Sequence, residues 1–149
     1  MKIVIGSDEA GFQLKKEMIT FLKTNGFSIE DLGCYDTEPV LYPDVACKVG
    51  MAIKTGEAKK GILICGTGIG MAMTANKVPG IRAAQCHDTF SAERAALSNN
   101  SHIITLGARV VGIELAKKIV MTWLDLEFKD GRSTVKINRI KEIEESFQK

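Results

Sequence analysis

The stretch GILICGTGIGMAMTANK, residues 61–77, decides the fold. It opens with a short apolar run typical of a buried strand and passes through Cys65 into a glycine-rich segment, residues 66–70. Glycines let the backbone approach a ligand closely, and several N–H groups can then point into one hollow. A helix that follows directly adds partial positive charge at its N-terminus. The stretch therefore predicts a strand, an anion-binding turn and a helix.

The same alternation of short apolar runs and longer helical periods continues on both sides of this stretch. Further strands are predicted at residues 2–6, 27–32, 81–85 and 103–106, and further helices at residues 12–25, 44–54, 89–97, 112–124 and 134–147. Such alternation implies parallel strands joined by helical crossovers. We therefore expect an α/β protein with a Rossmann-like, five-stranded parallel sheet flanked by helices, in the flavodoxin-like order 2-1-3-4-5, with a C-terminal helix.

Length and composition are those of one ordinary globular domain, which we expect to span residues 1–149. The net charge of +2 gives no support to a nucleic-acid groove or a membrane surface as partner. The N-terminus starts on a strand rather than as a signal peptide, so we expect a cytoplasmic protein. No internal repeat or linker divides the chain.

The four cysteines are Cys34, Cys47, Cys65 and Cys86. They show neither a CxxC spacing nor nearby paired histidines, so neither a zinc site nor a disulfide scaffold is expected. We interpret all four as reduced thiols and expect no metal.

Cys65 and the glycines after it are the first candidate for chemistry. Ligands of open α/β sheets bind beyond the carboxyl ends of the strands, where the strand order reverses. That edge would gather residues 7–9 and 65–70. A nest of N–H groups beside a cysteine favours its thiolate. The segment is not a P-loop and does not match GxGxxG, and a glycine turn beside an inert core cysteine is the structural alternative.

Beyond these patterns, the chain resembles the ribose-5-phosphate isomerase B / galactose-6-phosphate isomerase family along nearly its whole length. The matching pieces are GSDEAGF at 6–12, YPD at 42–44, ICGTGIG at 64–70, ANKVPGIRAA at 75–84, SAE at 91–93, LGARVVG at 106–112 and GR at 131–132. The resemblance implies a homodimer or a dimer of dimers with active sites at the subunit interface. It implies a sugar phosphate as substrate and no metal or organic cofactor.

The resemblance also implies roles for individual residues. Cys65 matches the base that removes the C2 proton of an open-chain aldose, giving a cis-enediolate. Thr67 matches a residue that moves a hydroxyl proton, and Asp8 lies near the reacting end. The remaining candidates are substrate-binding positions: Glu9, Tyr42, Gly66, Gly68, Ile69, Gly70, His87, Ser98, Asn99, Arg109, Arg132 and Lys136.

Among these positions the cations are candidates for binding the phosphate. Arg132, Lys136 and Arg139 would share one face of the terminal helix, and we expect Arg132 to reach the site of a partner subunit. A solvated basic stripe is the alternative.

The chain departs from the family pattern at four positions. Glu9 and Ser98 stand where the family usually has histidines, the second of which is credited with opening the sugar ring. Ser133 and Lys136 replace a further histidine and an arginine. These changes concern the substrate more than the proton transfer, because an open-chain, four-carbon sugar phosphate needs no ring opening. His87, and from a displaced position His102, are the remaining candidates for contacting substrate.

Several functions stay open at this point. Ribose 5-phosphate is the default substrate, and allose, galactose and tetrose phosphates are alternatives. Glu9 motivates a non-phosphorylated sugar, and Ser98 motivates a non-catalytic sugar-phosphate-binding subunit. A nucleotide-binding module is weaker, because Asp31 is poorly placed for a ribose.

Overall fold

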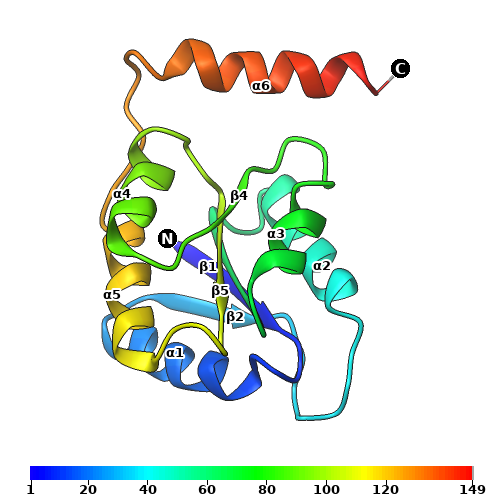
Figure 1. The fold of residues 1–149 in the computed structure, drawn as a ribbon, viewed down its shortest axis with the longest axis vertical. Coiled ribbons are helices and arrows are strands. Elements are labelled where there is room, and N and C mark those ends of the chain that lie inside the picture. Colours follow the sequence, from blue (N-terminus) through cyan, green and yellow to red (C-terminus); the bar gives the residue numbers. More distant parts are fainter. Residues whose placement is uncertain (149) are drawn as a thin grey trace.

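The computed structural model describes residues 1–148 as a parallel sheet covered by helices on both faces (Figure 1). The strands are β1 (Lys2–Ser7), β2 (Ser28–Asp31), β3 (Lys60–Cys65), β4 (Ala83–Gln85) and β5 (Ile103–Gly107). The helices are α1 (Phe12–Thr24), α2 (Tyr42–Lys54), α3 (Ile69–Ala75), α4 (Thr89–Leu97), α5 (Ile113–Leu124) and α6 (Thr134–Ser146). The predicted α/β class with five parallel strands is confirmed.

The predicted strand order is wrong at one edge. The sheet runs β2-β1-β3-β5-β4, so β5 rather than β4 lies beside β3. All five residues of β5 are buried, whereas β4 has three residues, none of them fully buried. A fully buried apolar strand belongs in the middle of a sheet covered on both faces, and a short, partly exposed one belongs at the edge.

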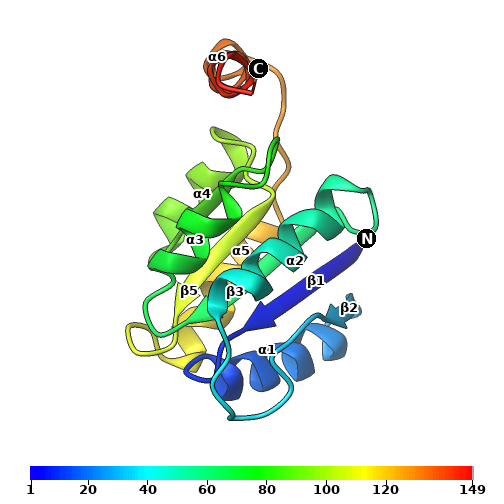
Figure 2. The ribbon, with the colours of Figure 1, turned by 90° about the vertical axis from the view of Figure 1, so that its right-hand side faces the viewer.

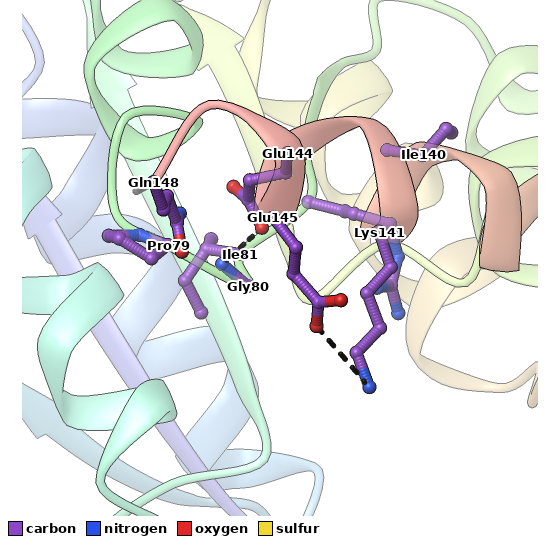
Figure 3. A pocket seen from close by; sticks show the side chains of 9 residues that line it. Pro79, Gly80, Ile81, Ile140, Lys141, Glu144, Glu145 and Gln148 are labelled. Carbon is purple, nitrogen blue, oxygen red and sulfur yellow. Dashed lines mark hydrogen bonds and ion pairs between the residues drawn. The ribbon is translucent and has the colours of Figure 1, made fainter.

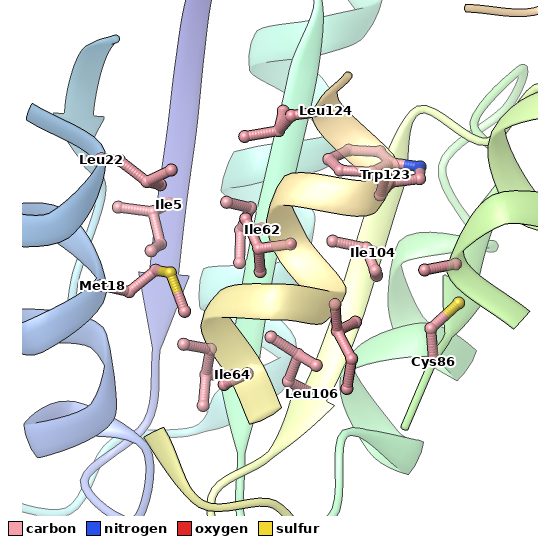
Figure 4. Close-up of a cluster of buried hydrophobic side chains, with 14 of the residues drawn as sticks. Ile5, Met18, Leu22, Ile62, Ile64, Cys86, Ile104, Leu106, Trp123 and Leu124 are labelled. Carbon is pink, nitrogen blue, oxygen red and sulfur yellow. The ribbon is translucent and has the colours of Figure 1, made fainter. Parts of the chain in front are cut away.

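Two apolar clusters hold the layers together, one on each face of the sheet. The larger packs α1, α4 and α5 against Ile5, Ile62 and Ile104, and it includes the fully buried Trp123 (Figure 4). The indole N–H of Trp123 donates to Ser101 Oγ at 2.8 Å, which satisfies the polar atom of this large side chain. The smaller cluster packs α2 and α3 against the other face and includes Cys65.

Helix α6 lies apart from the sheet, at the end of the molecule opposite the tip of β1 (Figures 1 and 2). Ile137 is the one residue of α6 that is buried, and Ile140, Ile143 and Phe147 at its outer part are exposed. The backbone N–H of Gly80 donates to the Glu144 carboxylate at 2.8 Å and anchors the helix to the body.

Candidate active site

The carboxyl ends of β1, β3 and β5 bring the candidate residues together. These three strands are neighbours in the sheet, and Cys65, the last residue of β3, pairs in register with Gly107, the last residue of β5. Asp8 follows β1, and its backbone N–H donates to the carbonyl of Ile64 at 3.2 Å. Asp8 and Cys65 therefore stand at adjacent strand ends, as expected for ligand sites in such sheets.

We call residues 66–70 the glycine turn. The Cys65 thiol is 5% exposed and accepts a hydrogen bond from the Gly68 N–H, with 3.1 Å between Sγ and N. The N–H of Ile69 donates to Thr67 Oγ1 at 3.2 Å. Gly68 has φ +77°, and a Cβ there would lie 2.9 Å from the Leu106 carbonyl carbon. Glycine is thus required at this position for both conformation and space.

Two larger side chains, Tyr42 and Arg109, pack against the glycine turn. A Cβ on Gly70 would clash with the ring of Tyr42, so that ring packs directly over the backbone. A Cβ on Gly66 would lie 3.1 Å from Nη1 of Arg109, which places the guanidinium beside the first peptide after Cys65. Tyr42, from α2, and Arg109, just after β5, consequently flank the glycine turn.

The Asp8 carboxylate is nearly buried, at 9% exposure, and it accepts a hydrogen bond from the Gly11 N–H at 3.0 Å. Burial raises the pKa of Asp8 above its ordinary value, while the Gly11 hydrogen bond acts in the opposite direction. The negative charge of Glu9 also raises the Asp8 pKa, and the positive charge of Arg109 lowers it.

Glu9, where the family pattern has histidine, turns toward the segment before α2. Its Oε2 accepts a hydrogen bond from the Val40 N–H at 3.1 Å. Backbone N–H groups, its own and that of Val40, lower the pKa of Glu9, and Arg109 contributes in the same direction. The carboxylate therefore links Val40, shortly before α2, to the residues that follow β1.

His87 lies at the same edge and contacts the end of β5. Its Nε2 accepts a hydrogen bond from the Gly107 N–H at 2.9 Å, so the ring proton sits on Nδ1. Burial lowers the pKa of His87, and Asp88 opposes that shift. The neutral imidazole thus secures Gly107 beside Cys65, and a contact with substrate stays a prediction.

Four predicted residues lie away from Cys65 within this chain. Ser98 and Asn99 follow α4 at the amino edge of the sheet, where Ser98 Oγ accepts from Arg94 at 3.1 Å and the Asn99 carbonyl accepts from Arg82 at 3.3 Å. Arg132 and Lys136 belong to the entry of α6 and to α6 itself, at the far end of the molecule (Figure 2).

His102, the candidate for reaching the site from a displaced position, also lies away from Cys65 within this chain, and its contact with substrate stays a prediction. His102 directly precedes β5, so it too lies at the amino edge. Its Nδ1 accepts a hydrogen bond from the Arg82 N–H at 3.0 Å, and burial, with the Arg82 charge, lowers the pKa of His102 to about 4.

Lys15 is a structural element of the site that sequence patterns missed. Its side chain is fully buried; the ammonium pairs with Asp31 at 2.7 Å and donates to the carbonyl of Cys34. Residues 33 and 34 in turn exchange two backbone hydrogen bonds with Ser7, immediately before Asp8. The available signal was a lysine between Leu14 and Met18, on the inward stripe of α1.

Hollows also lie away from the residues around Cys65 in the described chain. One of about 440 Å³ lies between α6 and residues 79–82 and is lined by Ile81, Ile140, Glu144 and their neighbours (Figure 3).

In residues 1–148 no three His, Cys, Asp or Glu side chains are grouped to hold a metal ion, and all four thiols are free. None of the described helices has the length and apolarity that crossing a membrane requires.

Comparisons with known proteins agree with this geometry. The model of the family described as Ribose/Galactose Isomerase matches residues 3–140. Ribose-5-P isomerase B of Listeria innocua is 52% identical over 97% of this chain and 98% of its own length. D-erythrulose-4-phosphate isomerase of Pectobacterium atrosepticum is also 52% identical, over 94% of this chain and 93% of its own. The structure of ribose-5-phosphate isomerase B from Clostridium thermocellum superimposes with a TM-score of 0.97, at 48% identity and 99% coverage of both chains.

The chain shares its five-stranded parallel sheet with these relatives along nearly its whole length. Together with the thiol and the glycine turn at the carboxyl edge of the sheet, this defines an aldose–ketose isomerase of the sugar-phosphate class. The chain belongs to the ribose/galactose isomerase family, as its sequence resemblance predicted.

Proposed function

We propose that the chain interconverts an aldose phosphate and a ketose phosphate, ribose 5-phosphate and ribulose 5-phosphate by default, with Cys65 as the base. The observation that carries the proposal is the Gly68 N–H donating to Cys65 Sγ at the end of β3, next to the end of β1 that Asp8 follows. A hydrogen bond to sulfur favours the thiolate, which is the form that can accept a proton.

The proposed reaction is a proton transfer between two neighbouring carbons. The thiolate removes the C2 proton of the open-chain aldose, and the carbonyl electrons move onto O1, giving a cis-enediolate. Thr67 passes the O2 proton to O1, and the Cys65 thiol returns its proton to C1, which leaves the ketose. Asp8 lies beside the reacting carbons. The N–H groups of the glycine turn would stabilise the charge that develops on the enediolate.

The phosphate would be held by cations from two chains. Arg109 is the predicted phosphate-binding cation that lies beside Cys65 in the same chain. Arg132 and Lys136 lie at the far end of the molecule, on a helix whose exposed face carries Ile140 and Ile143. An apolar face of this kind suits a second copy of the chain, which would bring its Arg132 and Lys136, together with Ser98 and Asn99, to the Cys65 site.

A four-carbon sugar phosphate is the second candidate substrate. Ser98 stands where ring opening would need an acid or base, and a serine hydroxyl is a poor one at neutral pH. A tetrose phosphate cannot form the stable ring that requires this help. The D-erythrulose-4-phosphate isomerase named above, at 52% identity, supports this candidate.

Deuterium exchange followed by proton NMR tests the proposal. The protein is incubated in D2O with ribose 5-phosphate, erythrose 4-phosphate and unphosphorylated ribose, beside Cys65→Ala and the exposed-thiol control Cys47→Ala. We expect exchange at C2 of one phosphorylated sugar, its loss in Cys65→Ala and its retention in Cys47→Ala. Exchange that survives in Cys65→Ala would exclude the cysteine base, and binding of a sugar without exchange would indicate a non-catalytic role.

A further inference from the structure

Two peptide units of the glycine turn carry the N–H groups that contact the proposed catalytic side chains. The unit between Thr67 and Gly68 supplies the N–H that donates to Cys65 Sγ at 3.1 Å. The unit between Gly68 and Ile69 supplies the N–H that donates to Thr67 Oγ1 at 3.2 Å. In a planar trans peptide the N–H and the C=O point in opposite directions and rotate together. A contact that holds the carbonyl therefore also aims the N–H.

The carbonyls of these two peptide units each accept a hydrogen bond from a side chain, one from β4 and one from β5. Nε2 of Gln85 donates to the Thr67 carbonyl at 2.7 Å, and Oγ1 of Thr105 donates to the Gly68 carbonyl at 2.8 Å. The Gly68 carbonyl also accepts the Ala72 N–H, the first hydrogen bond of α3, at 3.2 Å. Gln85 and Thr105 are register partners on β4 and β5, so their side chains leave the same face of the sheet side by side.

Packing alone does not account for these two polar residues. Thr105 is fully buried within the apolar strand IITLG, and a buried hydroxyl is costly unless it is hydrogen-bonded. Gln85 is exposed at the end of β4, where its amide reaches the glycine turn. Gly107, on the same strand as Thr105, permits the approach, because a Cβ there would lie 2.7 Å from the Thr67 Cα.

We propose that Gln85 and Thr105 are positioning residues of the active site. Gln85 holds the Thr67 carbonyl outward and so directs the Gly68 N–H at the Cys65 thiol. Thr105 holds the Gly68 carbonyl and so directs the Ile69 N–H at the Thr67 hydroxyl. Both act through the backbone of the glycine turn, and their effect on turnover rests on the proposed function of Cys65 and Thr67.

The two contacts predict different consequences. Without the Gln85 amide the Gly68 N–H is free to rotate away, and the thiolate of Cys65 loses a hydrogen-bond donor. Without the Thr105 hydroxyl the Gly68 carbonyl keeps its helical partner, so the effect on Thr67 is smaller. Removing an oxyanion donor outright costs roughly a hundredfold or more in kcat, and loosening one should cost about tenfold.

Alkylation of Cys65 by iodoacetamide measures the first contact without any substrate. The thiolate is the reacting form, and peptide mapping by mass spectrometry separates Cys65 from the exposed Cys47, which serves as internal standard. In Gln85→Met, which keeps the length of the side chain and removes the donor, we expect alkylation of Cys65 at pH 7 to fall about threefold or more relative to Cys47. We expect kcat to fall about tenfold, with KM changed by less than about twofold.

A matched pair tests the second contact. Thr105→Val removes the hydroxyl and keeps the shape, whereas Thr105→Ser keeps the hydroxyl. We expect Thr105→Val to lower kcat about threefold and Thr105→Ser to restore it, at equal Cys65 alkylation. Unchanged alkylation and kcat in Gln85→Met would overturn the assignment of Gln85, and equal kcat in the Val and Ser variants would overturn that of Thr105. If Cys65→Ala remains active while Gln85→Met slows alkylation, the proposed function fails and the positioning of the thiol by Gln85 stands.

Discussion

Replacing Lys15 by methionine should destabilise the fold at residues 31–34, which are hydrogen-bonded to Ser7 immediately before Asp8. Methionine fills a similar volume but leaves the Cys34 carbonyl without its buried donor and Asp31 without its cation. An unsatisfied buried acceptor costs about 1–3 kcal/mol, and breaking a buried ion pair costs about 3–5 kcal/mol. The Asp31 side chain is 31% exposed, so water recovers part of the second cost, and we expect a total of about 3 kcal/mol.

Thermal unfolding followed by circular dichroism measures this loss. For a chain of this size, about 3 kcal/mol corresponds to a fall in Tm of roughly 6–12 °C. Lys16→Met is the matched control, because the neighbouring Lys16 is exposed and its substitution should move Tm by less than about 2 °C. Equal Tm values for the two variants would refute the role of the buried ammonium in securing residues 31–34.

Three further perturbations have expected outcomes. Gly107→Ala would place a Cβ 2.7 Å from the Thr67 Cα, so kcat should fall more than about tenfold in steady-state assays while the far-ultraviolet spectrum is retained. Burial lowers the pKa of His102 to about 4 in the folded chain, against 6.5 in the unfolded chain, so between these pH values the unfolded chain binds the extra proton. His102 should therefore lower the free energy of unfolding by about 3 kcal/mol as pH falls from 6.5 to 4. Urea unfolding of His102→Asn, whose Oδ1 can still accept the Arg82 N–H, should not show this loss. Arg109→Met should raise KM for the phosphorylated sugar about tenfold or more and leave kcat within about threefold, and an unchanged KM would contradict phosphate binding.

The class of fold, and the edge of the sheet at which the candidate site lies, were predictable from local sequence. The alternation of short apolar runs with segments of helical periodicity predicts parallel strands with helical crossovers. Ligands of such sheets bind at the carboxyl ends of the strands. Asp8 and Cys65 come just after two predicted strands, and in the structure they lie at the ends of the neighbouring strands β1 and β3. The glycines after Cys65 indicated a tight turn, and Gly68 at φ +77° occupies it.

Local sequence did not predict how far some of the candidate site residues lie from Cys65. Ser98, Asn99, Arg132 and Lys136 were grouped with Cys65 by resemblance, and one chain keeps them at its other end. Periodicity says which residues are helical, but it does not say how far a helix end lies from a given strand end. We propose that they reach Cys65 from a second copy of the chain, a proposal that the exposed apolar face of α6 supports.

Local sequence predicts the strands, the helices, the family and the candidate site residues, because periodicity and motifs depend on neighbours along the chain. The strand order β3-β5-β4, the hydrogen bonds from Gln85 and Thr105 to the glycine turn, and the burial of Lys15 against Asp31 and Cys34 arise only in the tertiary structure. These contacts join residues 16 to 37 positions apart or depend on which strand occupies the centre of the sheet. They are settled by competition for burial across the whole sheet, which no local pattern records.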